Sequence, residues 1–176
     1  MKRRAVFLDR DGVLNRAVLR KGKPYPPDSI AEVEILPGVV NALQCLKEAG
    51  FFLIVVSNQP DVARGKTLQE TVEAINAYLA KHLPLDRFIT CYHDSGAGCD
   101  CRKPRPGMLL AGAKEFDVDL AASFMVGDRW RDVEAGIAAG CKTIFIDYGY
   151  TEKAPQTYDC RVFSTYEAVM YILRKD

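Results

Sequence analysis

The segment AVFLDRDGVLN, residues 5–15, decides the fold of this chain. Its first four residues are apolar, and they are followed closely by Asp9, Asp11 and Gly12. A short apolar run that ends in charged residues and a glycine is typical of a buried strand followed by a sharp turn. The segment therefore predicts a strand that presents two carboxylates at its carboxyl end.

Similar short apolar runs recur along the chain, with helical patterns between them. Further strands are predicted over 51–56, 88–91, 124–126 and 143–146. Apolar residues at helical spacing predict helices over 39–49, 68–82, 107–116, 131–139 and 165–173. This alternation predicts an α/β fold with about five strands and five helices: a Rossmann-like, doubly wound, mainly parallel sheet with flanking helices.

The length and composition of the chain limit its class. A chain of 176 residues that is 48% hydrophobic can form one domain, expected over residues 1–176. Lysine and arginine number 24 against 23 aspartates and glutamates, so the basic excess of a nucleic-acid binder is absent. The first apolar stretch is too short for a signal peptide or a membrane span. We therefore expect a cytoplasmic monomer with no nucleic-acid, membrane or obligate protein partner.

The stretch 15–37 interrupts the alternation of strands and helices. It contains Pro24, Pro26 and Pro27 among several basic residues and directly follows the two aspartates. Loops of this length in compact domains often cover binding sites. We expect a long loop or small flap that faces the substrate, and no segment is large enough to form a separate cap domain.

Chemically useful side chains follow four of the predicted strands. Asp9 and Asp11 follow the first, Ser57 the second and Asp128 the fourth, while Lys103 comes shortly after the third. In an open parallel sheet these carboxyl ends lie together and form the ligand site. A carboxylate can attack phosphorus while a neighbouring carboxyl group acts as general acid and base. The pattern therefore predicts phosphoryl transfer assisted by Mg²⁺.

The chain resembles the haloacid dehalogenase superfamily of phosphatases. It contains that superfamily's four motifs in the same order, as DRDGV, VVSN, RKP and GDRWRD. The resemblance implies that Asp9 is the nucleophile, forming an aspartyl-phosphate, and that Asp11 is the acid and base. It implies that Ser57 and Lys103 hold the phosphoryl group. Mg²⁺ would be bound by Asp9, Asp128 and the main-chain carbonyl of Asp11.

Asp132 lies one helical turn after Asp128, in the motif GDRWRD. This spacing places its carboxylate near the predicted metal ligand. We expect Asp132 to act as a supporting neighbour of the Mg²⁺ site.

The segment 91–103 concentrates metal-binding side chains. Cys91, His93, Cys99 and Cys101 form a set of three thiols and one imidazole, which suits tetrahedral Zn²⁺. Since protein side chains would fill all four positions, the zinc would be structural. The alternatives are a loop with free thiols and a surface histidine, or an oxidised cysteine pair.

A zinc loop in this position resembles the branch of the superfamily that contains heptose-bisphosphate and histidinol-phosphate phosphatases. By that resemblance Asn58, Gln59, Arg102 and Arg129 contact the substrate. Arg102 stands beside Lys103, and two adjacent cations can hold two phosphates. The two cations fit a bisphosphate, and the resemblance implies that the substrate is D-glycero-D-manno-heptose 1,7-bisphosphate, which would lose its 7-phosphate.

Two other functions remain open from the sequence. The chain could be a phosphatase for histidinol phosphate or another small sugar phosphate. It could also be a non-catalytic binding module stabilised by zinc. The segment NQPDVARG places Pro60 and Asp61 where related motifs carry serine and glycine, which bears directly on substrate choice.

Overall fold

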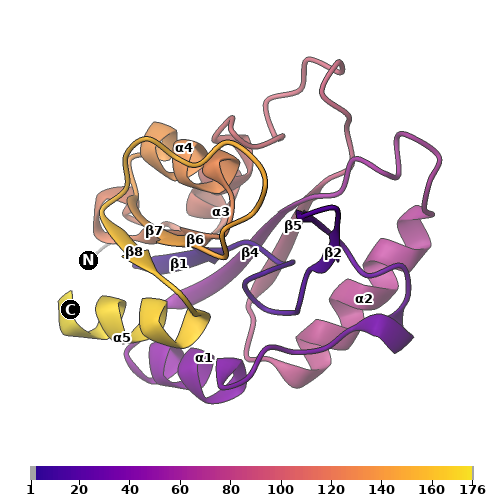
Figure 1. Cartoon of the computed structure of the whole chain (residues 1–176). Helices are drawn as coiled ribbons and strands as arrows, with labels where there is room; N and C mark the ends of the chain where they lie inside the picture. The colour runs from indigo at the N-terminus through magenta and orange to yellow at the C-terminus, as the bar shows by residue number, and fades with distance from the viewer. Residues whose placement is uncertain (1–2, 176) are drawn as a thin grey trace.

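The computed structural model describes residues 3–175 and shows three layers, with a sheet between two layers of helices (Figure 1). The sheet has six strands in the order β5-β4-β1-β6-β7-β8, and all five neighbouring pairs are parallel. The strands are β1 (Ala5–Leu8), β4 (Phe52–Asn58), β5 (Arg87–Cys91), β6 (Phe124–Gly127), β7 (Lys142–Ile146) and β8 (Cys160–Val162). The expected doubly wound α/β fold is confirmed.

Five α-helices cover the sheet. One face carries α1 (Val39–Glu48), α2 (Gln69–His82) and α5 (Thr165–Lys175), and the other carries α3 (Gly107–Phe116) and α4 (Trp130–Ala139). Two short 3₁₀ helices, η1 (Ile30–Glu32) and η2 (Leu120–Ala122), complete the set. The helices predicted from the sequence are all present, and their ends differ by no more than two residues.

The strand β1 shows why both faces need helices. Successive residues of a strand point to opposite faces of the sheet. All four side chains of β1 are buried, so both faces of the sheet must be covered at this strand. Val6 and Leu8 pack in the cluster beneath α1, α2 and α5, whereas Ala5 and Phe7 pack beneath α3 and α4. A strand that is apolar on both sides is typical of the centre of a parallel sheet.

The expected number of about five strands was too low. The strand β8 extends the sheet beyond β7, with Ile144 in register with Cys160. It has only three residues and carries Arg161 at its centre, so it lacks the apolar run on which the prediction depended. Its strand conformation depends on pairing with β7, which is a tertiary interaction.

The stretch 15–37, called the flap below, contains the second sheet of the fold, which has two strands. The strands β2 (Val18–Arg20) and β3 (Lys23–Tyr25) form an antiparallel hairpin. The two ends of the flap meet at its base, where Asn15 and Ile35 form an isolated antiparallel bridge. The backbone N–H of Arg16 donates to the carbonyl of Glu34 at 2.8 Å. The flap is therefore a closed excursion from the main fold.

The direction of strand order reverses at β1, with β4 on one side and β6 on the other. Ligands of open parallel sheets bind at such a switch point, at the carboxyl ends of the strands. The site is therefore expected where β1, β4 and β6 end. None of the helices formed by residues 3–175 has the length and apolar character needed to span a bilayer.

Candidate active site

Three buried carboxylates meet at the switch point. Asp9 follows β1, Asp128 follows β6, and Asp132 lies in the first turn of α4. One oxygen from each carboxylate lies within 4.8 Å of the others. The structure thus brings together the two side chains predicted as Mg²⁺ ligands and the predicted supporting neighbour.

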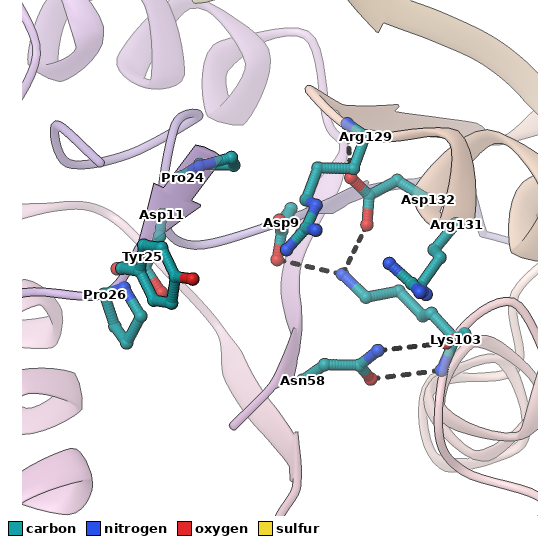
Figure 2. Close-up of a pocket in the computed structure, with 10 residues that line it drawn as sticks. All are labelled: Asp9, Asp11, Pro24, Tyr25, Pro26, Asn58, Lys103, Arg129, Arg131 and Asp132. Carbon is teal, nitrogen blue, oxygen red and sulfur yellow. Dashed lines mark hydrogen bonds and ion pairs between the residues drawn. The ribbon is translucent and has the colours of Figure 1, made fainter. Parts of the chain in front are cut away.

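Lys103 lies against this carboxylate cluster with its side chain only 2% exposed. Its Nζ atom is 2.9 Å from Asp9 Oδ1 and 2.7 Å from Asp132 Oδ1 (Figure 2). Burial acts to lower the pKa of Lys103, but the two carboxylates outweigh it and raise the pKa. The ammonium therefore stays charged at neutral pH.

The carboxylate cluster has more negative charge than one lysine can balance. Burial, together with repulsion from Asp132, raises the pKa of Asp9 to about 6. Burial and the nearby Asp9 raise the pKa of Asp128 well above its usual range. Asp128 Oδ1 is buried and has no hydrogen-bond partner among residues 3–175. A hard divalent cation such as Mg²⁺ fits this oxygen-rich, electron-rich site.

Gly12 allows the turn after β1 to approach Asp128 closely. Its φ of +91° lies in the left-handed region, and a Cβ at this position would be 1.9 Å from Asp128 Oδ2. We expect Gly12→Ala to lower the free energy of unfolding by about 1–3 kcal/mol from backbone strain, plus the cost of the displaced carboxylate. Urea denaturation measures this change.

Gly65→Ala is a matched control for this prediction. Gly65 also has a left-handed φ, +66°, but no atom lies within 4 Å of the added Cβ. This variant should therefore show the strain without the clash. Equal losses of stability in the two variants would contradict the proposed role of close packing between Gly12 and Asp128.

Asp11 lies apart from the other carboxylates, beside Tyr25 and Pro26 of the flap (Figure 2). Its carboxylate accepts hydrogen bonds from the Arg10 guanidinium and from Gln59 Nε2, the latter at 2.9 Å. It still lines the same hollow as Asp9, a cavity of about 60 Å³. The predicted acid and base thus faces the site but is held by protein donors.

The carboxyl end of β4 and the residue after it connect the site to the segment that carries Lys103. Ser57 is buried, and its hydroxyl accepts a hydrogen bond from Gln59 Nε2 at 2.9 Å. The Asn58 side chain binds both backbone groups of Lys103, each at 3.0 Å. The predicted substrate contacts of Asn58 and Gln59 stay predictions. In this structure both side-chain amides bind other residues of the site.

The two arginines expected to contact substrate already have protein partners. Arg102 Nη1 donates to the carbonyl of His93 at 3.1 Å. Arg129 forms a two-point ion pair with Glu152, in which Nε lies 2.8 Å from Oε1. The Arg129 guanidinium is therefore engaged at two points, whereas Arg102 makes a single hydrogen bond through Nη1.

The Cys and His cluster is also assembled. Ligand atoms of Cys91, His93, Cys99 and Cys101 all lie within 4.8 Å of one another. The Cys91 sulfur lies 3.8 Å from the Cys99 sulfur and 3.1 Å from the Cys101 sulfur, so the ligand atoms are close enough to share one ion. All four are compatible with a metal site, and the cysteines are free rather than paired as a disulfide.

Three residues of the site were not selected from the sequence. Arg10, which stands between the two aspartates in the sequence, is fully buried and donates to Asn76 Oδ1 in α2 at 3.0 Å. Tyr150 O–H donates to Asp128 Oδ2 at 2.7 Å. Arg131 lines the hollow beside Lys103. The sequence contains features that could have pointed to these residues. Arg10 stands between two catalytic candidates, Tyr150 lies shortly after a predicted strand, and Arg131 is a basic residue at the start of a predicted helix.

Comparison with known proteins agrees with this fold. The model of the HAD-hydrolase-like family, a name short for haloacid dehalogenase, matches residues 100–164. The D-glycero-beta-D-manno-heptose-1,7-bisphosphate 7-phosphatase of Escherichia coli strain K12 is 38% identical over 151 residues, covering 79% of this chain and 76% of the relative. The protein of that name from Pasteurella multocida is 36% identical over 159 residues, covering 84% and 83%.

A solved structure is similar over nearly the whole chain. The D,D-heptose 1,7-bisphosphate phosphatase from B. bronchiseptica, crystallised with magnesium and phosphate, has a TM-score of 0.79 and 29% identity, covering 99% of both chains. The fold is thus that of the haloacid-dehalogenase-like hydrolases. Within this class, the chain belongs to the family of phosphatases represented by these relatives. It is a phosphoric monoester hydrolase, so the alternative of a non-catalytic binding module was wrong.

Proposed function

We propose that this chain hydrolyses the 7-phosphate of D-glycero-D-manno-heptose 1,7-bisphosphate through an aspartyl-phosphate on Asp9. The observation that carries the proposal is the position of the Asp9 carboxylate, at the end of β1, against Lys103 and two further carboxylates. The relatives named above, which match most of the chain, support the choice of substrate.

The roles of the chain's own residues follow from this arrangement. Lys103 holds Asp9 Oδ1 at 2.9 Å, so the carboxylate is oriented and its second oxygen can attack phosphorus. The charged ammonium and the Ser57 hydroxyl stabilise the phosphoryl oxygens. Asp11 lines the same hollow, where it gives a proton to the leaving oxygen and later takes one from water.

The carboxylate cluster would hold Mg²⁺ through Asp9, Asp128 and the main-chain carbonyl of Asp11. The partnerless buried Oδ1 of Asp128 supports this assignment. When bound, the ion neutralises charge between the nucleophile and the phosphoryl oxygens. Asp132 supports the site by binding Lys103 and by accepting a hydrogen bond from the Arg129 backbone N–H at 2.9 Å.

Tyr150 should act as a partner of the metal ligand. Because its hydroxyl binds Asp128 Oδ2, it restrains the orientation of this carboxylate, whose Oδ1 is buried and has no partner among residues 3–175. We expect Tyr150→Phe to weaken Mg²⁺ binding by about 10-fold or more, as is usual for loss of a hydrogen bond to a metal ligand. Isothermal titration calorimetry of the purified protein with Mg²⁺ measures this change in affinity.

Tyr148→Phe provides the comparison for Tyr150→Phe. The Tyr148 hydroxyl donates to the backbone carbonyl of Gly12 at 3.0 Å and does not bind a carboxylate. Its removal should weaken Mg²⁺ binding much less. If the two variants bound Mg²⁺ with equal affinity, the Tyr150 contact would not orient the ligand.

The four-residue Cys and His cluster would hold structural Zn²⁺. Burial raises the pKa of the Cys101 thiol to about 12, so a cation is needed to keep it as a thiolate. Cys101 is two residues before Lys103, so the bound ion would fix the segment that presents the lysine. This role supports catalysis through position alone.

A comparison of substrates tests the proposed function. Purified protein with Mg²⁺ is assayed on both anomers of the heptose bisphosphate, on histidinol phosphate and on common sugar monophosphates. The heptose bisphosphate should give the highest kcat/KM. A higher kcat/KM for histidinol phosphate would reject the proposed substrate while leaving the phosphatase mechanism in place.

A further inference from the structure

Arg10 carries a full charge on a side chain that is 0% exposed. Burial of an ion pair costs desolvation free energy that the attraction between the two charges often fails to offset, so such a pair is weak evidence for stability. Arg10 stands between Asp9 and Asp11 in the sequence, just after β1. Departures from the usual rules of burial occur mainly at functional sites. A buried cation at this position therefore indicates a role in the chemistry.

The Arg10 guanidinium binds both oxygens of the Asp11 carboxylate. Its Nε lies 3.3 Å from Oδ1 and 3.2 Å from Oδ2, and its Nη2 lies 3.1 Å from Oδ2. Asn15 Nδ2 and Gln59 Nε2 also donate to this carboxylate, each at 2.9 Å. A planar guanidinium that contacts both oxygens restricts rotation of a carboxylate more than a single donor does. Arg10 is therefore placed to set the direction in which Asp11 faces.

The backbone around Asp11 is held by other contacts. The Arg10 carbonyl accepts hydrogen bonds from the backbone N–H groups of Leu14, at 2.9 Å, and Asn15, at 3.3 Å. The N–H of Gly12 donates to the carbonyl of Asn15 at 2.7 Å. These bonds do not involve the guanidinium. Its loss would leave the turn in place and release chiefly the Asp11 side chain.

Asn76 holds Arg10 from the side of α2. It shares the buried face of this helix with three apolar side chains, those of Val72, Ile75 and Leu79. Asn76 Oδ1 accepts a hydrogen bond from Arg10 Nη1 at 3.0 Å, and its Nδ2 donates to Thr90 Oγ1 in β5 at 3.3 Å. A polar residue at this core position thus connects Asp11, through Arg10, to α2 and β5.

We propose that Arg10, held by Asn76, is a positioning residue that aligns the Asp11 carboxyl group for proton transfer in both halves of the reaction. The inference rests on the proposed function, in which Asp11 is the acid and base, and assigns the group that orients it. Arg10 acts only through Asp11, which lines the hollow that contains Asp9.

Alignment of Asp11 matters at both proton transfers. In the first half, an Asp9 oxygen bonds to phosphorus, the bond to the leaving oxygen breaks, and that oxygen takes the proton of Asp11. In the second half, water attacks phosphorus and gives a proton to Asp11, and the bond to Asp9 breaks. General acid–base catalysis contributes about 10²- to 10⁴-fold, and a displacement of about 1 Å can cost about 10²-fold.

The test compares Arg10→Met with the wild type on three phosphate esters, in single turnovers with excess enzyme and Mg²⁺. The alkoxide of the heptose bisphosphate needs the proton most, phenolate from phenyl phosphate needs it less, and p-nitrophenolate from p-nitrophenyl phosphate needs it least. The first step should slow by about 10- to 100-fold on the heptose bisphosphate, less on phenyl phosphate and hardly at all on p-nitrophenyl phosphate. Equal losses on all three esters, as a merely structural role gives, or no loss on the sugar ester, would overturn the proposal.

The second half of the reaction gives an independent measurement. Every ester forms the same aspartyl-phosphate, so its hydrolysis should slow equally for all of them. With p-nitrophenyl phosphate in excess, Arg10→Met should release p-nitrophenol in a burst close to the enzyme concentration and then turn over slowly. If this slow phase ran at the wild-type rate, Arg10 would not align the base and the proposal would fail.

Asn76→Ala tests the support of Arg10 in a variant that keeps the guanidinium, and it decides the matter if Arg10→Met does not fold. It should give the same order of losses on the three esters, each smaller than in Arg10→Met. Asn41→Ala, an exposed position on α1, is the matched control and should keep wild-type rates. Wild-type rates for Asn76→Ala on every ester would reject the proposed role of Asn76.

These outcomes separate the inference from the proposed function. If the heptose bisphosphate is not the preferred substrate, the two aryl esters still compare a leaving group that needs the proton with one that needs it less. If the wild type forms no covalent phosphate on Asp9, the proposed function fails. If it forms that phosphate and Arg10→Met loses equally on all esters, only the role of Arg10 fails.

Discussion

Replacing Asp9 by asparagine should lower kcat by roughly 10⁴- to 10⁶-fold, the range seen when a catalytic nucleophile is removed. The amide has nearly the same shape, and its oxygen can still accept the hydrogen bond from Lys103 Nζ. The variant should therefore fold, because the change removes the attacking carboxylate and little else. Release of inorganic phosphate from the heptose bisphosphate in Mg²⁺ measures the loss.

Detection of the covalent intermediate makes this test specific. Mass spectrometry of acid-quenched reactions should find phosphate on the peptide that contains Asp9 in the wild type and no phosphate there in Asp9→Asn. Asp117→Asn, an exposed aspartate after α3, is the control and should keep wild-type activity. Substantial turnover by Asp9→Asn would reject the aspartyl-phosphate mechanism.

Loss of the Cys and His cluster should have the second large effect, this time on stability. Cys101→Ser removes one of four proposed zinc ligands, and metal binding free energy is folding free energy when the site forms only in the native state. We expect Tm to fall by roughly 10 °C or more. Activity should fall as well, since Lys103 follows the cluster directly. Thermal denaturation and elemental analysis of zinc content are the measurements.

Cys45→Ser is the control for the zinc prediction. Cys45 is exposed on α1 and lies outside the four-residue cluster. It should keep both the zinc content and the Tm of the wild type. A Cys101→Ser variant whose zinc content and Tm both match those of the wild type would show that the cluster is not a structural metal site.

The central part of the fold was predictable because its signals are local. Strands such as β1 are continuous apolar runs, and helices such as α4 end at a glycine, Gly140, with a left-handed φ of 85°. The flap hairpin lacks such a signal, since Pro24 interrupts β3. Its strands depend on pairing with each other, which residue patterns over a few positions do not report.

The predicted site residues were brought together because they follow neighbouring parallel strands. Asp9, Ser57 and Asp128 come from β1, β4 and β6, which are adjacent in the sheet. The partners of the longer side chains were not predictable in this way. Glu152 captures Arg129 from 23 residues away, and this contact depends on the path of the loop after β7. Long, flexible cations can reach many partners, so only the folded structure decides between them.

The closed base of the flap has a consequence for protein engineering. Asn15 and Ile35 are bridged, so the hairpin leaves and rejoins the main chain at nearly one point. Segments whose ends lie close together can be exchanged with little strain on the rest of the fold. Tyr25 and Pro26, which line the reacting hollow, belong to this exchangeable unit. A library of transplanted hairpins could therefore change the substrate specificity while the catalytic side chains at the carboxyl ends of the strands stayed the same.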